Sequence, residues 1–162
     1  MTEARELRHG VDLLLVCSSG GHLLQLCALR EAWEGLDRAW VSFDKSDVRS
    51  LLAGERVVHA HGPTNRNIGN LLRNGILAIR LIRELRPRAV LTTGAGVAVP
   101  FAWVARLHGA RVVYVESMTR IEGPSLSMRM IAPVASRLYV QWPELAPRVR
   151  RARFAGRVFD AA

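Results

Sequence analysis

Short β-rich runs alternate with helical segments along almost the whole chain, and this alternation constrains the fold more than any other feature. The first run, VDLLLVC at 11–17, is continuously apolar, which is typical of a parallel strand covered on both faces. Such alternation predicts a doubly wound, mostly parallel α/β sheet of the Rossmann-like kind. Further strands are predicted at 38–44, 56–61, 88–94, 111–117, 136–142 and 151–156. Helices are predicted at 22–33, 47–53, 66–86, 97–108, 125–131 and 143–149.

The length of the chain and the lack of a linker predict a single domain over 1–162. A chain of 162 residues is long enough for one core, and no linker, repeat or low-complexity stretch interrupts it. No apolar stretch approaches the roughly 18 residues that a membrane-spanning helix needs. The polar start, MTEARELRHG, does not resemble a secretory signal.

The charge is divided unevenly along the chain. Residues 1–65 carry seven Lys/Arg and nine Asp/Glu, whereas residues 66–162 carry sixteen and five, so the balances of −2 and +11 sum to the net +9. A basic body of this kind favours phosphates, whether in nucleic acid, an anionic membrane surface or a phosphorylated ligand. Charge alone does not choose among the three. The arginine-rich segment PELAPRVRRARF at 143–154 fits a partner, a membrane or a solvated surface.

The loop after the first predicted strand is the first candidate binding element. It contains Ser18, Ser19, Gly20, Gly21 and His22. Glycines in a strand-to-helix turn let the backbone approach a ligand, and the following helix offers N–H groups to an anion. We expect a phosphate or sugar contact here, with His22 as a neutral base or polar contact. The sequence matches neither G-x-G-x-x-G nor the G-K-[ST] ending of a P-loop.

Two further loops lie at the same predicted edge of the sheet. Thr93 and Gly94 end the fourth predicted strand segment and Gly96 follows it, while Glu116 lies at the end of the fifth and Arg120 follows it. In open α/β sheets ligands bind at the carboxyl ends of the strands, so we expect the three loops to share one site. The Glu116 carboxylate is a candidate base, and the arginine is a candidate partner of that carboxylate or of a phosphate.

The predicted helix at 66–86 has more apolar surface than one sheet contact requires. On the other side of the helix we expect Leu77 and Leu81 to be exposed beside Arg73 and Arg80. Leucines ringed by arginines suit the headgroup boundary of an anionic membrane, which we favour over a partner protein or a covering segment of the chain. The stripe predicted to pack on the sheet contains Ile68, Leu71, Leu72, Ile79 and Ile82.

Taken together, these segments resemble a known family. The chain resembles the PssD-type subunits of bacterial exopolysaccharide glycosyltransferases, which are relatives of the membrane-anchoring subunit of the two-part N-acetylglucosaminyltransferase of dolichol-linked oligosaccharide synthesis. The glycine loops are also similar, more distantly, to the acceptor half of MurG-type glycosyltransferases. The matching stretches are SSGGHLLQL, TTGAGVAVPF, VYVESMTR, RLYVQWPEL and FAGRVFD.

The resemblance implies half of an enzyme with the GT-B architecture. This chain would be the amino-terminal, acceptor-side domain, and a separate donor-binding subunit would complete the cleft. The pair would transfer a sugar from a UDP-sugar to a polyprenyl-diphosphate-linked acceptor, with inversion and without a metal or cofactor. It would work as a hetero-oligomer on the cytoplasmic face of the cell membrane, bound peripherally at an anionic surface.

The resemblance also implies roles for residues. The loop from Ser18 to His22 would face the diphosphate, Thr93, Gly94 and Gly96 would hold the acceptor phosphates, and Arg120 would line the acceptor sugar. The base would be Glu116 or His22, with Glu116 preferred because a strand-end carboxylate is expected to face the cleft.

Two other classes of function remain open from the sequence. A stand-alone nucleotide-binding Rossmann enzyme would use Asp44 on a ribose, but the dinucleotide fingerprint is missing. A basic module that binds nucleic acid lacks helix-turn-helix, zinc and RNP signatures and has only 6% aromatic residues.

Overall fold

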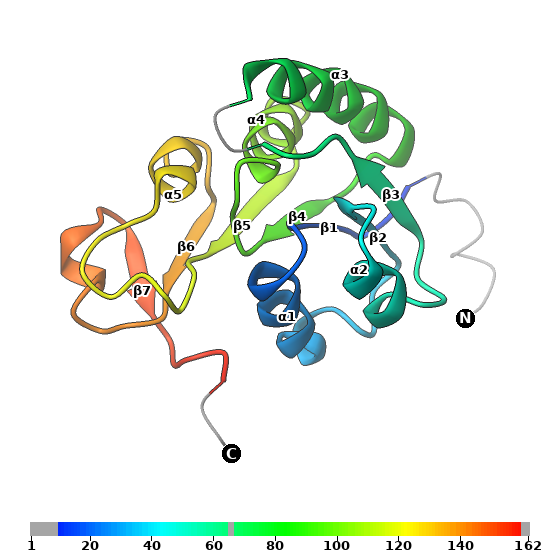
Figure 1. The fold of residues 1–162 in the computed structure, drawn as a ribbon. Coiled ribbons are helices and arrows are strands. Elements are labelled where there is room, and N and C mark those ends of the chain that lie inside the picture. Colours follow the sequence, from blue (N-terminus) through cyan, green and yellow to red (C-terminus); the bar gives the residue numbers. More distant parts are fainter. Residues whose placement is uncertain (1–9, 65–66, 160–162) are drawn as a thin grey trace, which may run out of the picture.

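The computed structural model describes residues 10–64 and 67–159, which form a seven-stranded sheet with helices on both faces (Figure 1). All pairings are parallel, and the order is β3-β2-β1-β4-β5-β6-β7. Each predicted strand segment contains one of these strands, so the predicted doubly wound α/β fold is confirmed. The strands are β1 (Leu13–Val16), β2 (Arg38–Phe43), β3 (Val57–Ala60), β4 (Ala89–Thr92), β5 (Arg111–Val115), β6 (Arg137–Val140) and β7 (Ala152–Phe154).

The central strand explains why the first apolar run is continuous. All four residues of β1 are buried, and the strand pairs with β2 on one side and β4 on the other. Its side chains therefore enter two separate cores, one on each face of the sheet. The first core includes Phe101 and Tyr114, and the second includes Trp33 and Trp40.

The helices largely follow the predicted positions. They are α1 (Gly21–Ala28), α2 (Ser46–Leu51), α3 (Ile68–Leu85), α4 (Ala98–Leu107) and α5 (Leu126–Ile131), with 3₁₀ turns η2 (Arg30–Ala32) and η3 (Ala146–Arg148). The helix predicted at 143–149 is wrong, because only η3 forms there. Pro143 and Pro147 have no N–H to donate, which prevents a longer α-helical ladder. Residue 66, the predicted start of the third helix, lies outside the described residues.

The orientation of α3 differs from the prediction. Leu81 is 3% exposed and packs in the core, and Leu77 packs against the same core. Ile68, Leu72, Ile76 and Ile79 are instead exposed, at 72%, 65%, 71% and 42%. Of the stripe predicted to pack on the sheet, Ile82 is buried as expected, but Ile68, Leu72 and Ile79 point to solvent. Arg73 and Arg80 are exposed as expected. We call Ile68, Leu72, Ile76 and Ile79 the α3 ridge.

Two buried asparagines explain this reversal. Asn74 receives a hydrogen bond from the N–H of His61 at 2.8 Å and donates one to the carbonyl of the same residue at 2.9 Å. Asn70 donates to the Pro63 carbonyl at 2.8 Å. Both asparagines therefore belong to the buried face because their polar groups are satisfied by the segment that precedes the helix. The small Ala78 lies on the same buried face.

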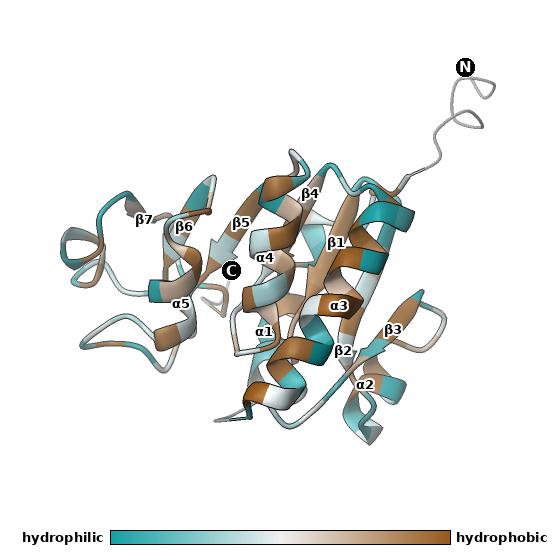
Figure 2. Ribbon diagram, turned by 90° about the horizontal axis from the view of Figure 1, so that it is seen from above, coloured by the Kyte–Doolittle hydropathy of each residue, from teal (hydrophilic) through white to brown (hydrophobic). Residues whose placement is uncertain are grey.

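Three helices form one layer on the upper face of the sheet, where α3, α4 and α5 lie in sequence from one edge toward the other (Figure 2). Among the described residues, no helix has the length and apolar character needed to cross a membrane. The strand order reverses direction at β1, and the crevice outside the carboxyl ends at such a point is where ligands bind in this fold class.

Candidate functional site

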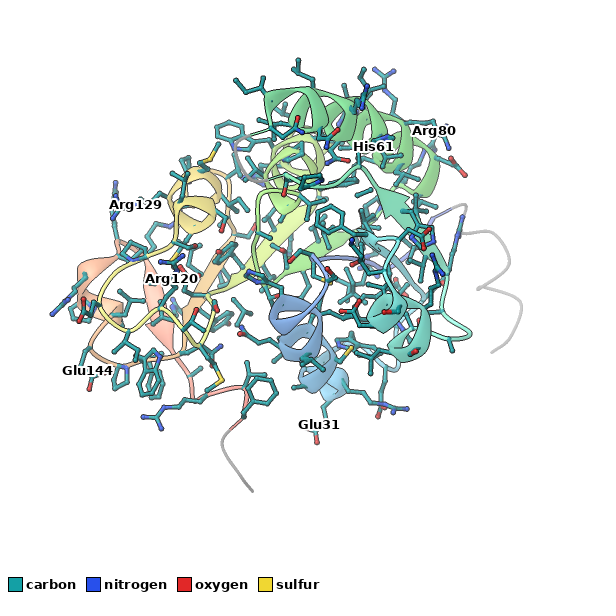
Figure 3. The ribbon with its side chains drawn as sticks, in the orientation of Figure 1. Glu31, His61, Arg80, Arg120, Arg129 and Glu144 are labelled. Atoms are coloured by element: carbon teal, nitrogen blue, oxygen red, sulfur yellow. The ribbon has the colours of Figure 1, made fainter. Side chains whose placement is uncertain are left out.

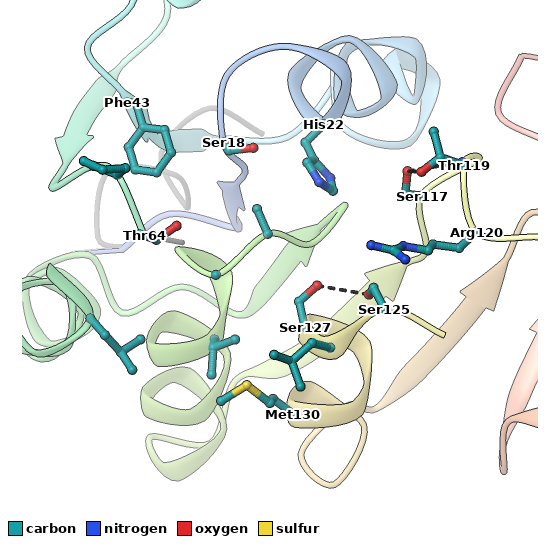
Figure 4. A pocket seen from close by; sticks show the side chains of 16 residues that line it. Ser18, His22, Phe43, Thr64, Ser117, Thr119, Arg120, Ser125, Ser127 and Met130 are labelled. Atoms are coloured by element: carbon teal, nitrogen blue, oxygen red, sulfur yellow. Dashed lines mark hydrogen bonds between the residues drawn. The ribbon is translucent and has the colours of Figure 1, made fainter. Parts of the chain in front are cut away.

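A cleft of about 640 Å³ opens among the loops that follow β1, β3, β4 and β5 (Figure 4). The three loops that were expected to share a site all contribute to it. One wall is apolar and includes Leu71, Val99, Leu126 and Met130. The polar groups of the cleft come from Ser18, His22, Thr64, Ser117, Thr119, Arg120, Ser125 and Ser127.

The glycine loop enters this cleft only at its two ends, through Ser18 and His22. Gly20 has φ 74°, a left-handed conformation that favours glycine, and its N–H donates to Asp47 Oδ2 at 2.7 Å. The Gly20 N–H, which we expected to donate to a bound anion, therefore already donates to the Asp47 carboxylate. The structure therefore places residues 19–21 outside the lining of the cleft, where they shape the turn.

His22 is fixed by a reciprocal pair of hydrogen bonds with the loop after β4. Its Nδ1 lies 2.8 Å from the Thr93 carbonyl oxygen, and Thr93 Oγ1 donates to the His22 carbonyl at 2.8 Å. Since a carbonyl only accepts, Nδ1 carries the proton and donates it. Nε2 is then the ring nitrogen that can take a proton from a ligand. Thr93 itself is fully buried, so its hydroxyl holds His22 instead of contacting a ligand.

The loop after β4 is shaped by close contacts that require glycine. Gly94 has φ 101°, and a Cβ there would lie 2.6 Å from the Tyr114 hydroxyl oxygen. At Gly96 a Cβ would lie 3.1 Å from Thr64 Oγ1. Gly96 lines the cleft together with Ala95, whereas Gly94 serves the packing of the loop on β5. Of the three residues predicted to hold acceptor phosphates, only Gly96 therefore borders the cleft.

Glu116 does not occupy the place that the sequence suggested. It is 0% exposed, Oε1 accepts from the N–H of Ser117 at 2.8 Å, and Oε2 accepts from the N–H of Ser125 at 2.8 Å. The Tyr114 hydroxyl also donates to Oε1 at 3.3 Å. Because both oxygens are engaged inside the protein, the expectation of a carboxylate projecting into the cleft is wrong. Glu116 instead joins the two ends of the segment between β5 and α5.

A group of hydroxyls that was not predicted from the sequence lies beside this carboxylate. The Tyr114 hydroxyl lies 3.0 Å from Ser125 Oγ and 3.1 Å from Ser127 Oγ. Burial, and then the Glu116 charge, raises the pKa of Tyr114 well above its usual range, so the phenol stays protonated. Ser125 also caps α5 by accepting from the N–H of Met128 at 3.1 Å, a helix-start pattern that the sequence does show.

Arg120 brings positive charge to the cleft. Its guanidinium extends toward Ser127 and His22 (Figure 4), and among the described residues that line the cleft it carries the only formal charge. The expected pairing with Glu116 does not form, since that carboxylate is occupied by the partners given above. In contrast, Arg129 points away from the molecule (Figure 3).

The loop that carries Arg120 is held at its base by buried side chains. Gln25, 3% exposed, donates to the Glu116 carbonyl at 2.8 Å and accepts from the N–H of Met118 at 3.2 Å. Trp142 Nε1 donates to the Met118 carbonyl at 2.7 Å. These contacts connect α1 and the end of β6 to the loop, so the arginine projects from an anchored segment. Within the described ranges, no three His, Cys, Asp or Glu side chains are grouped as metal ligands would be.

The fold and the position of the cleft define a class of domain. The chain is one Rossmann-like α/β unit equivalent to the amino-terminal half of GT-B glycosyltransferases and related epimerases. MurG of Acinetobacter baumannii superimposes with a TM-score of 0.71 at 18% identity, over 88% of this chain and 45% of MurG. The UDP-N-acetylglucosamine 2-epimerase of Rickettsia bellii gives 0.69 at 10% identity, over 93% of this chain and 46% of the epimerase.

Sequence comparison gives the family. A family model described as "Oligosaccharide biosynthesis protein Alg14 like" matches residues 56–158, and the chain belongs to this family. The protein called UDP-N-acetylglucosamine transferase subunit ALG14 in Eremothecium gossypii is 45% identical over an alignment of 115 residues that covers 65% of this chain and 51% of that protein. Its namesake in Debaryomyces hansenii is 27% identical over 181 residues, covering 93% of this chain and 77% of that protein. The chain thus spans about half of the first relative and a larger share of the second.

Proposed function

We propose that this chain is the acceptor-side subunit of a two-part glycosyltransferase. A separate donor-binding subunit forms the other wall of the cleft and holds most of the UDP-sugar, with UDP-N-acetylglucosamine as the first donor to test. The acceptor is a polyprenyl-diphosphate-linked sugar in oligosaccharide or exopolysaccharide biosynthesis, as in the PssD-type subunits. Three observations support this: family membership, the name that the relatives carry, and a fold equivalent to half of MurG.

The observation that carries the proposal is the composition of the cleft. Arg120 supplies one cation for a phosphate, the surrounding hydroxyls suit a sugar, and Leu126 and Met130 continue the cleft along an apolar wall. Leu126 is 73% exposed and Met130 40%. An acceptor that combines phosphate, sugar and polyprenyl chain meets each of these surfaces in turn.

In the proposed reaction His22 is the base and this chain positions the acceptor. As the acceptor oxygen bonds to the anomeric carbon, the bond to the UDP oxygen breaks, and the proton of the acceptor hydroxyl passes to His22 Nε2. The Thr93 carbonyl holds the other ring nitrogen at 2.8 Å and so keeps this lone pair available. Glu116 holds the loop of Arg120 and does not exchange protons with the acceptor.

We also propose that the α3 ridge binds the cytoplasmic face of an anionic membrane. Arg73, Arg80 and Arg83 lie on the exposed side of the same helix, so charge complementarity favours a bilayer with anionic lipids. Burying one large aliphatic side chain contributes about 1.5–3 kcal/mol, whereas each arginine near the surface contributes about 1 kcal/mol. The apolar ridge therefore contributes more to membrane binding than the arginines do.

Sugar transfer by the reconstituted pair tests this function. The chain is co-expressed with its donor-binding subunit, and transfer from a radiolabelled UDP-sugar to a polyprenyl-diphosphate acceptor is measured. We expect activity only when both subunits are present. Arg120→Gln should raise the acceptor KM about tenfold or more, because a charge-assisted hydrogen bond to phosphate is lost. Arg106→Gln, an exposed arginine of α4, is the matched control. Full activity of either chain alone would contradict the proposal.

A further inference from the structure

Arginines mark the edge of the sheet opposite the cleft. Arg38, Arg111 and Arg137 are the first residues of β2, β5 and β6, and Arg56, Arg88 and Arg151 directly precede β3, β4 and β7. All strands are parallel, so these six residues lie along the edge where the strands begin. The cleft lies at the other edge, where the strands end, and the two features are therefore separate.

Two of these arginines are neutralised by carboxylates. Arg38 Nη2 lies 2.6 Å from Glu55 Oε1, and Arg88 Nη1 lies 3.5 Å from Asp12 Oδ1. At β6 and β7 the guanidinium groups bond to backbone carbonyls instead. Arg137 donates to the Ser136 carbonyl at 3.0 Å. The matching bond of Arg151 reaches the Ala135 carbonyl at 3.1 Å.

A third arginine completes a basic group at this end of the sheet. Arg153 of β7 is the register partner of Tyr139, which lies two residues after Arg137 on β6. Side chains two apart share a face of a strand, so Arg137 and Arg153 leave the sheet on the same face. Together with Arg151 they line a hollow of about 210 Å³ between the two strands. Among the described residues, no carboxylate forms an ion pair with any of the three.

We propose that the hollow between β6 and β7 is a second anion site, which binds a phosphate group. Three guanidinium groups around one small hollow repel one another, and a multivalent anion relieves that repulsion. The planar donors of arginine match phosphate oxygens, and backbone bonds already orient two of the three. No aromatic side chain lines the hollow within the described part of the chain, so stacking on a nucleic-acid base has no platform there.

The first test is a calorimetric titration of the chain with inorganic phosphate and with pyrophosphate. The chain carries Arg120→Gln throughout, so that the proposed cleft site makes no contribution. We expect Arg137→Gln with Arg153→Gln to weaken binding about tenfold or more, and Arg106→Gln to leave it unchanged. Equal affinity with and without the Arg137 and Arg153 substitutions would overturn the proposal. Because sugar transfer is not measured, this result is independent of the proposed function.

A second measurement distinguishes the two sources of such a phosphate. Vesicles of phosphatidylcholine with phosphatidic acid are used with the chain carrying Leu72→Glu and Ile76→Glu, so that the α3 ridge does not bind them. Recruitment that depends on Arg137 and Arg153 supports a lipid headgroup. Binding of free phosphate without recruitment supports a soluble phosphorylated ligand. If only single-stranded oligonucleotide depends on these arginines and phosphate does not bind, the phosphate site is refuted.

Discussion

His22 and Glu116, the two side chains considered as the base, have opposite surroundings: His22 lines the cleft and Glu116 does not. The carboxylate of Glu116 is fully buried and accepts two backbone N–H bonds. The ring of His22 is partly exposed, lines the cleft and uses only Nδ1 inside the protein. A base must reach the substrate, and the buried Glu116 does not line the cleft, so we expect His22 to be the base.

Replacement of His22 tests this assignment. We expect His22→Asn to lower kcat of the reconstituted pair by about 10²–10⁴-fold with little change in KM, because general base catalysis contributes on that scale. The matched control is Thr93→Val, which removes the hydroxyl bond to the His22 carbonyl but keeps the carbonyl that orients the ring. Normal kcat in His22→Asn would exclude this histidine as the base.

Replacement of Glu116 should act on stability instead. The amide group that Glu116→Gln introduces can accept through one atom only, so one of the N–H groups of Ser117 and Ser125 loses its acceptor. We expect the free energy of unfolding, from urea titration, to fall by about 1–3 kcal/mol. The acceptor KM should rise while kcat changes little. The exposed Glu144→Gln is the control, and a large loss of kcat with unchanged stability would show that the carboxylate acts in the chemistry.

The helix α3 shows how an element can be predicted correctly in position and wrongly in orientation. Its periodicity predicts a helix correctly, but Ile68, Leu72 and Ile79 were assigned to the core and are exposed, whereas Ile82 of the same stripe is buried as predicted. The buried face contains Asn70 and Asn74, whose partners lie in the segment of His61 and Pro63. Those partners are close in space only after β3 and α3 have folded. The periodicity of apolar residues in the sequence does not reveal such contacts between distant segments.

The exposed ridge of this helix leads to a test of membrane binding. We expect Leu72→Glu with Ile76→Glu to abolish co-sedimentation with anionic vesicles while the circular dichroism spectrum is unchanged, because both side chains are exposed. Leu51→Glu, on α2 at the opposite face of the sheet, should bind as the unmodified chain does. High salt should weaken binding only in part, since burial of apolar side chains contributes more than charge. Unchanged binding in the double variant would remove the ridge from the proposal.

For the molecule as a whole, the fold could be predicted from the sequence, but which side chains line the cleft could not. Seven short β-rich runs, most of them separated by helices, determine a parallel sheet, and the sheet places its loops at one edge. Which side chain of a loop enters the cleft depends on contacts between loops. The Gly20 N–H is hydrogen-bonded to Asp47, and the Thr93 hydroxyl is hydrogen-bonded to the His22 carbonyl. The residues of these pairs are 27 and 71 positions apart along the chain. Spacing within a motif does not contain that information.

The stability of the whole domain should depend on pH through Glu55. Hydrogen bonding to Arg38 is the main cause that holds the pKa of Glu55 below its ordinary value. Because the folded pKa is the lower one, the ion pair stabilises the fold above the unfolded pKa, and this contribution is lost as the pH falls. We expect the free energy of unfolding to drop between about pH 5 and pH 3, by on the order of 1 kcal/mol more than in Glu55→Gln. Glu31→Gln, an exposed residue, should follow the unmodified chain.

The strand order also matches the order in which a ribosome delivers the chain. β1 is made first, and β2 and β3 then add outward on one side of it. β4 pairs with the free side of β1, and β5, β6 and β7 extend that second wing one strand at a time. Each strand after β1 pairs with a strand that was synthesised before it, so an edge for pairing already exists when it emerges. The nascent chain can therefore assemble this parallel sheet progressively during translation, although every pairing needs a long crossover.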